Sequence, residues 1–165
     1  GIETYILNWT DDEEAMKVAA RENAISLKEM KRLRDELSII LASLENESKR
    51  DESIKVAGYV HQSMVAGVLP DYLQEYNRGL KQALFYVLVG AKMPAALLEV
   101  GFISNPFEEK MLGNEIYRLN LANSIVSGIL KYFSESPVKM LITQEESPDS
   151  RKNKTVPVKY SNIKK

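Results

Sequence analysis

The distribution of apolar and polar residues along the chain has two periods, and each predicts a different kind of element. Residues 2–7, IETYIL, are rich in β-branched and aromatic side chains, which is typical of a strand. Residues 82–89, QALFYVLV, and residues 95–102, AALLEVGF, predict two further strands. Because residues 95–102 are apolar on both faces, we expect this strand in the middle of a sheet that helices cover on both sides.

Between the strands, apolar residues recur at spacings of three and four, which predicts amphipathic helices. We place helices at residues 11–22, 27–45 and 54–66, with residues 46–53 as either a polar break or an exposed helical turn. Residues 69–79 have turn residues at both ends and predict a loop.

Two local signals mark helix starts. Thr10 and Glu13 have the spacing of a capping box, so the first helix should begin just after Thr10. Asn105 followed by Pro106 is the favoured cap and first position of another helix. The clearest helix is predicted over residues 114–133. One face of it is formed by Ile116, Leu119, Ala122, Asn123, Val126, Ile129 and Phe133.

Composition narrows the class of protein. The chain has 165 residues, of which 44% are hydrophobic and 27% are charged, which is typical of a globular domain. A net charge of -1 argues against a nucleic-acid-binding protein, and no apolar run reaches the roughly 18 residues of a membrane helix. The absence of cysteine excludes disulfides and thiolate metal sites. Strands that alternate with helices predict an α/β domain with a mixed, mostly parallel sheet and helices on both faces.

The C-terminal segment differs from the rest. From about Pro137 onward there are few large apolar residues, and the chain ends strongly basic. We therefore predict a domain over residues 1–134 and a flexible, disordered basic tail over residues 135–165, because such a segment cannot bury enough surface to offset its ordering entropy. The alternative is a weak electrostatic contact with an anionic polymer.

Glu99 is the candidate for chemistry, because it is the single carboxylate in the apolar run 94–103. A buried charge without compensation costs several kcal/mol. Three explanations are open: an ion pair with a base such as Lys81 or Lys92, a strand end that lets the carboxylate reach solvent, or a site where a metal or substrate balances the charge. Gly101 would leave space beside Glu99 for such a group to approach.

The amino-acid sequence around Glu99 resembles that of a known family. The segment from Asn77 to Phe133 closely resembles the C-terminal part of the zinc-dependent N-acetylmuramoyl-L-alanine amidases of bacterial cell-wall turnover. The resemblance is carried by the motif R-G-x-K-Q-A at residues 78–83, FYVL at 85–88, and MPAALLEVGFISN at 93–105. The opening GIETYILN and the AARENA segment extend it to roughly residues 1–134. It implies that these residues are the C-terminal portion of a catalytic domain.

The resemblance also implies an activity. Members of the family hydrolyse the amide between N-acetylmuramic acid and the L-alanine of the peptidoglycan stem peptide. A zinc-bound water attacks, and a second carboxylate, which aligns with Glu99, acts as general acid/base. Lys81 and Gln82 precede a strand expected beside that of Glu99, so we predict that they line the substrate cleft together with Arg78. Alternatively, Gln82 ties the turn to the backbone and Arg78 is a surface charge.

The zinc ligands of the family have no counterpart in this sequence. The family's His-Glu-His set lies in the N-terminal half of its domain, so we expect the ligands upstream of Gly1. His61 is the only histidine here, and we predict a surface or packing role for it. Because a catalytic zinc normally needs three protein ligands, we expect this chain alone to bind zinc poorly and to be inactive. The alternative function is a non-catalytic peptidoglycan-binding or regulatory module.

Further expectations follow from the resemblance. The substrate places the protein in the periplasm or cell wall of a bacterium, with an export signal upstream that is not visible here. Some family members carry a helix that covers the active site until an activator protein removes it. Residues 25–50 either form such a helix, with Glu29, Glu36, Glu45 or Glu47 reaching the metal, or form a plain packed helix.

Overall fold

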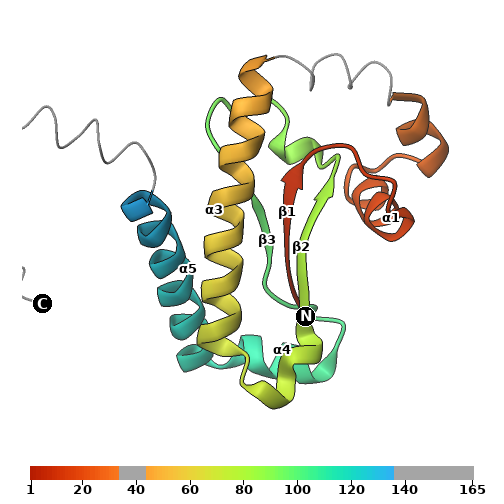
Figure 1. Cartoon of the computed structure of the whole chain (residues 1–165). Coiled ribbons are helices and arrows are strands. Elements are labelled where there is room, and N and C mark those ends of the chain that lie inside the picture. The colour runs from red at the N-terminus through yellow and green to blue at the C-terminus, as the bar shows by residue number, and fades with distance from the viewer. Residues whose placement is uncertain (34–43, 136–165) are drawn as a thin grey trace, which may run out of the picture. The chain divides into compact units, whose positions relative to one another are not determined.

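The computed structural model describes residues 1–33 and 44–135, without the side chains of residues 44–47, 71 and 72 (Figure 1). Residues 1–132 form one compact unit, which is described below. The elements in chain order are β1 (Ile2–Leu7), α1 (Glu13–Glu22), α3 (Leu44–Val68), the 3₁₀ helix η1 (Asp71–Tyr76), β2 (Asn77–Ala83), the 3₁₀ helix η2 (Tyr86–Leu88), β3 (Leu97–Glu99), α4 (Pro106–Gly113) and α5 (Glu115–Glu135). Residues 27–33 are also helical. Beyond residue 135, the predicted tail lies outside the described residues.

The sheet of the described residues has three strands in the order β2-β1-β3. β1 runs parallel to β2, with Tyr5 opposite Lys81, and antiparallel to β3, with Glu3 opposite Glu99. The α/β class with a mixed sheet is therefore confirmed. The central place predicted for the strand at 95–102 is wrong, because β1 occupies the centre and β3 pairs on one side only.

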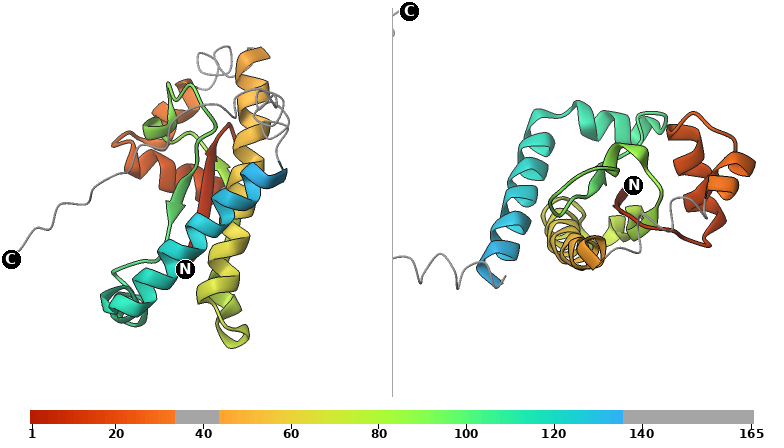
Figure 2. Two further views of the ribbon diagram at one scale, coloured as in Figure 1. Left: turned by 90° about the vertical axis from the view of Figure 1, so that its left-hand side faces the viewer. Right: turned by 90° about the horizontal axis from the view of Figure 1, so that it is seen from above.

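Helices lie on both faces of the sheet, as predicted (Figure 2). Side chains alternate along β1, so that Tyr5 faces α1 while Ile2 faces α3. The cluster under α1 includes Tyr5, Ala15, Met16, Ala19, Ala20, Phe85 and Leu88. The cluster under α3 includes Ile2, Val60, Met64, Leu69 and Leu121. Flanking residues of β3 contribute to both clusters, which explains why an edge strand is apolar on both faces.

The second strand lies earlier than its apolar pattern predicted. β2 covers residues 77–83 instead of 82–89, and the predicted loop contains η1 and the start of β2. The apolar residues Phe85 and Leu88 are buried against α1 through a turn and a short 3₁₀ helix. β2 is mostly polar, yet its backbone pairs with β1 along its length. Backbone pairing does not depend on side-chain polarity, so the periodicity misplaced this strand.

One helix start was predicted correctly and one was not. Asn105 caps α4, because its Oδ1 accepts hydrogen bonds from the backbone N–H groups of Phe107 at 3.0 Å and Glu108 at 3.4 Å. The capping box at Thr10 is wrong: Asp12 is the cap of α1. Its Oδ1 accepts from two backbone N–H groups of the first turn at 2.9 and 3.2 Å, while the Thr10 hydroxyl accepts from the Asp12 N–H at 3.1 Å.

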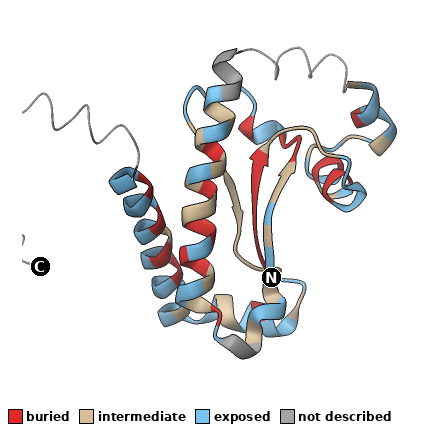
Figure 3. Cartoon of the chain, viewed as in Figure 1, coloured by how far each residue is buried: buried red, intermediate tan, exposed pale blue. Residues whose placement is uncertain are grey.

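The α3 and α5 helices pack through small residues. Residues 46–53 are helical and belong to α3, so the helical alternative is correct for them, although Ser53 is buried and the turn is not exposed throughout. α5 packs through Leu121, Ser124, Gly128 and Tyr132, which are buried (Figure 3). The face predicted from spacing is not the packed one, since its members Ile116, Leu119 and Val126 are 70%, 59% and 54% exposed. Within the described residues, no helix combines the length and apolar character that crossing a membrane requires.

Candidate functional site

Glu99 is the last residue of β3 and lies directly opposite Glu3 of β1. Because β3 runs against β1 and β2, its carboxyl end lies beside the amino-terminal halves of the other two strands. The strand register therefore brings two carboxylates onto one face of the sheet. Directly opposed side chains in an antiparallel pair lie about 5 Å apart at their Cβ atoms.

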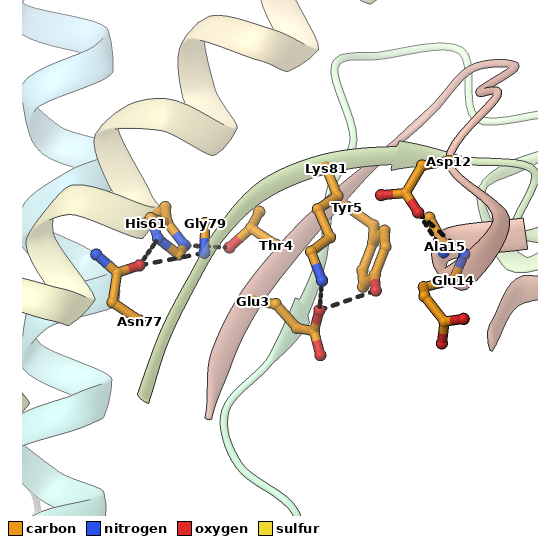
Figure 4. Close-up of polar contacts among 10 residues, drawn as sticks. All are labelled: Glu3, Thr4, Tyr5, Asp12, Glu14, Ala15, His61, Asn77, Gly79 and Lys81. Carbon is orange, nitrogen blue, oxygen red and sulfur yellow. Dashed lines mark hydrogen bonds and ion pairs between the residues drawn. The ribbon is translucent and has the colours of Figure 1, made fainter. Parts of the chain in front are cut away.

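Glu3 is the centre of a buried polar cluster on this face (Figure 4). The residue is only 3% exposed. Its Oε2 lies 2.5 Å from the Nζ of Lys81 in β2 and accepts a hydrogen bond from the Tyr5 hydroxyl at 2.9 Å. The Tyr5 ring is packed edge-on against Phe85, with centroids 4.7 Å apart. The ammonium and the hydroxyl compensate the charge that burial of Glu3 would otherwise leave unpaired.

Glu99 has a different environment, although it shares the face with Glu3. Among the described side chains, none forms an ion pair or a hydrogen bond with its carboxylate. Burial raises the pKa of Glu99 above the ordinary glutamate value, and the charges of Glu3 and Glu22 raise it further. Lys81 and Arg21 act in the opposite direction with smaller effects. Of the three explanations for Glu99, an ion pair with Lys81 is wrong, because Lys81 pairs with Glu3.

The other predicted site residues lie in different places. Lys81 faces the Glu3–Glu99 side of the sheet, whereas Gln82, one residue later, points to the opposite face. The Gln82 Oε1 accepts a hydrogen bond from the Asn8 Nδ2 at 2.6 Å. Arg78 lies at an irregularity in the β1–β2 register, and its guanidinium stands 5.0 Å from the centre of the Phe102 ring. The structure thus groups Lys81 with Glu99 and places Arg78 and Gln82 elsewhere.

Arg78 borders an open hollow on the loop that follows β3. Phe102, Ser104, Asn105 and Pro106 line this hollow together with Glu108. The Phe102 ring contacts the guanidinium by a cation–π interaction, with the guanidinium carbon 5.0 Å from the ring centre. An exposed, held guanidinium is suited to bind a carboxylate by two parallel hydrogen bonds.

The space predicted beside Gly101 is absent. Gly101 has φ +149°, a conformation that favours glycine. A Cβ at this position would lie 3.2 Å from the Glu108 Oε2 and 3.2 Å from the Leu112 Cδ1. Gly101 therefore lets α4 approach the chain after β3 and does not open room next to Glu99.

His61 has the packing role that we predicted as one alternative. It is 7% exposed, and its Nδ1 lies 3.0 Å from the Thr4 hydroxyl. Its Nε2 lies 2.9 Å from the Asn77 Oδ1, which also accepts a hydrogen bond from the Gly79 N–H at 3.1 Å. A neutral ring that donates from Nε2 and accepts at Nδ1 satisfies every partner. His61 thus ties α3 to β1 and β2 (Figure 4).

The described residues do not form a complete metal site. No three His, Cys, Asp or Glu side chains among them come together as a group able to hold a metal ion. A three-ligand zinc site therefore does not fit the described residues by themselves. Of the carboxylates considered for a covering helix, Glu29 is exposed. Glu36 and the side chains of Glu45 and Glu47 lie outside the described part of the chain.

Sequence reasoning missed Glu3. Its segment reads as a plain strand, and its partner Lys81 lies 78 residues further along the chain. The available signal was a charged residue at an inward position of a strand that is otherwise apolar or aromatic.

Comparison with known proteins defines the class to which this α/β domain belongs. The sequence model of N-acetylmuramoyl-L-alanine amidase matches residues 1–131, and the chain belongs to this family. The chain is similar to the probable cell wall amidase LytH of Staphylococcus aureus, with 47% identity over 58 residues. It is also similar to the uncharacterized protein YqiI of Bacillus subtilis, with 38% identity over 73 residues.

A solved structure agrees with the fold. The crystal structure of N-acetylmuramoyl-L-alanine amidase from Clostridium difficile 630 matches 82% of this chain and 50% of its own, with a TM-score of 0.51 and 26% identity. The LytH match covers 35% of this chain and 20% of LytH, and the YqiI match covers 44% of this chain and 35% of YqiI. This chain therefore spans half or less of the length of these three proteins.

Proposed function

We propose that the full gene product hydrolyses the amide bond between N-acetylmuramic acid and L-alanine in peptidoglycan, with Glu99 as general acid/base. The observation that carries the proposal is the state of Glu99. It is partly buried, it has no ionic partner among the described side chains, and it lies in the segment that most resembles the family. Glu3, the carboxylate opposite it, is by contrast buried and paired with Lys81.

In this reaction Glu99 first accepts a proton and then donates it. It takes a proton from the attacking water as the water oxygen bonds to the carbonyl carbon. It then delivers that proton to the amine nitrogen as the carbon–nitrogen bond breaks. Burial and the neighbouring carboxylates raise the pKa of Glu99, which brings its protonation closer to neutral pH. A carboxylate held in this way can both accept and release a proton under physiological conditions.

The zinc ion implied by the resemblance needs ligands from beyond the described residues, and we propose that the full gene product supplies them. Among the described residues, no three His, Cys, Asp or Glu side chains form a group able to hold the ion. The substrate implies that the protein acts in the periplasm or cell wall. We also propose that residues 25–50 cover the active site until an activator protein removes them.

For substrate binding, we propose that Arg78 makes the direct contact. Its guanidinium borders the open hollow after β3, on the loop that continues from Glu99. A peptide carboxylate is the group that a held guanidinium binds best. Lys81 and Gln82 already have partners inside the protein, so we propose that they shape the cleft wall through Glu3 and Asn8.

The direct test replaces Glu99 by Gln in the full gene product and measures release of stem peptide from purified peptidoglycan. We expect loss of hydrolysis with an unchanged circular dichroism spectrum, and unchanged hydrolysis in Glu13→Gln, a control on the exposed surface of α1. Near-normal turnover in Glu99→Gln would disprove the assignment. If the unmodified product binds peptidoglycan but does not cleave it, the alternative binding or regulatory module is correct.

A further inference from the structure

Glu3 is a buried titratable residue that the proposed reaction does not use. We propose that Glu3 is a positioning residue for Glu99: it holds the Lys81 ammonium on β1 and places a fixed carboxylate opposite Glu99, which keeps Glu99 unpaired and able to exchange a proton. This inference rests on the proposed function, because it explains how Glu99 is prepared for that role.

The strand order and the contacts of Lys81 explain why it pairs with Glu3 and not with Glu99. Lys81 lies on β2 opposite Tyr5, and its side chain extends diagonally to Glu3 on β1. Its Nζ is 2.5 Å from the Glu3 Oε2. Glu99 lies on the far side of β1, since the strand order is β2-β1-β3. Glu3, whose contact with Lys81 is drawn in Figure 4, therefore lies on the strand between that of the lysine and that of Glu99. Among the described side chains, the Lys81 ammonium forms its ion pair with Glu3 and none with Glu99.

The position of Glu3 is itself fixed. The Tyr5 hydroxyl donates to the same Oε2 that receives Lys81, and the Tyr5 ring is fully buried. Burial and the Glu3 carboxylate raise the pKa of Tyr5, so the hydroxyl keeps its proton and continues to donate. Two donors, one from β1 and one from β2, thus hold one oxygen of Glu3.

Four charged residues near Glu99 influence its ionisation. Glu3 on β1 and Glu22 on α1 favour the protonated form of Glu99, while Lys81 on β2 and Arg21 on α1 favour the ionised form. Glu22 is paired with its neighbour Arg21, and both side chains are more than half exposed, so solvent screens their effect. Glu3 is the buried member of this set and the one directly opposite Glu99.

A merely structural ion pair is the competing reading. In that case Glu3 and Lys81 only join β1 to β2, and removing Glu3 changes stability but leaves the titration of Glu99 unchanged. In the proposed case, Glu3→Gln removes the facing charge and releases Lys81 toward Glu99. Both changes favour the ionised form, so the pKa of Glu99 should fall.

The experiment follows the side-chain carboxyl carbons of 13C-labelled glutamates by NMR during a pH titration of this chain, with Glu99 assigned from Glu99→Gln. We expect the midpoint of Glu99 to move to lower pH in Glu3→Gln. Glu22→Gln is the matched control, since it removes a carboxylate from the same neighbourhood without releasing Lys81, and its shift should be smaller. An unchanged midpoint in folded Glu3→Gln, or an equal shift in both variants, would overturn the proposal.

If Glu3→Gln does not fold, the unmodified chain still decides. The chemical shift of the Glu3 carboxyl carbon should then change at the pH where Glu99 titrates, because Glu99 lies directly opposite Glu3. The absence of that change would overturn the proposal. The titration needs no catalysis, so it is independent of the hydrolysis test of Glu99→Gln. In the active gene product, the acid limb of the kcat/KM profile should shift to lower pH in Glu3→Gln.

Discussion

Gly128 of α5 lies directly against Val60 of α3, and a Cβ placed on Gly128 would stand 2.5 Å from the Val60 Cα. The same Cβ would lie 2.8 Å from the Tyr59 carbonyl oxygen, which is also backbone and cannot rotate away. We therefore expect Gly128→Ala to destabilise the fold by about 1–3 kcal/mol, measured by urea unfolding.

Gly58 in α3 provides the control for this prediction. A Cβ at Gly58 would meet nothing within 4 Å, so Gly58→Ala should stabilise the helix by about 0.5–1 kcal/mol. If Gly128→Ala stabilises the protein as Gly58→Ala does, intrinsic helix propensity and not helix contact governs position 128.

Glu99 should make the folded protein less stable as pH rises. Its pKa is raised by burial first and by Glu3 next, so between the ordinary glutamate value and the raised value the folded state binds more protons than the unfolded state. The free energy of unfolding therefore falls as pH increases through that window. Glu99→Gln removes the charge, and we expect its melting temperature to exceed that of the parent at pH 7.

The pH dependence of this difference is the check. It should shrink as the pH falls below about 4.3, where Glu99 is protonated in both states. Glu75→Gln, on the exposed part of η1, should give no such pH-dependent difference. A Glu99→Gln variant that melts below the parent at pH 7 would contradict the account of an uncompensated carboxylate.

His61 links three elements through its two ring nitrogens. His61→Ala leaves the Thr4 hydroxyl without its partner in a fully buried place, so we expect a loss of about 1–3 kcal/mol in urea unfolding. His61→Gln retains a donor and an acceptor and should lose clearly less. Equal losses in the two variants would show that ring packing, and not the hydrogen bonds, is what His61 contributes.

Arg78 should act on substrate binding alone. In the active gene product, Arg78→Gln should raise KM by about tenfold and leave kcat nearly unchanged, as expected for a lost contact of about 1.4 kcal/mol to a charged group. Lys92→Gln, which removes an exposed cation elsewhere, is the matched control. A fall in kcat without a change in KM would instead assign Arg78 to the reacting centre.

Local signals in the sequence located several elements correctly. The strand at Ile2–Leu7 and the cap at Asn105 depend on side chains within a few residues of one another, and both predictions are confirmed. The cap of α1 failed by two residues, because Thr10, Asp12 and nearby acidic residues all suit a helix start and only the chain path decides among them.

Long-range contacts explain the other errors. β2 is polar and was passed over in favour of the apolar run after it, since only pairing with β1 identifies it as a strand. The packed face of α5 was misassigned, because Ser124 and Gly128 are chosen for closeness to α3 and carry no hydrophobic signal. Glu99 was found from its isolation among apolar residues, whereas Glu3 is defined by a lysine 78 positions away.

Because β3 runs antiparallel to β1, Glu99 and the turn that precedes β3 lie at opposite ends of the sheet, and this turn is suited to carry a label. The turn at residues 89–92 follows the carboxyl ends of β1 and β2, near Leu7, whereas Glu99 lies by their amino-terminal halves. Since the chain has no cysteine, Lys92→Cys would give a single thiol for a fluorophore at an exposed site. Such a dye would follow the position of the protein while standing at the opposite end of the sheet from Glu99.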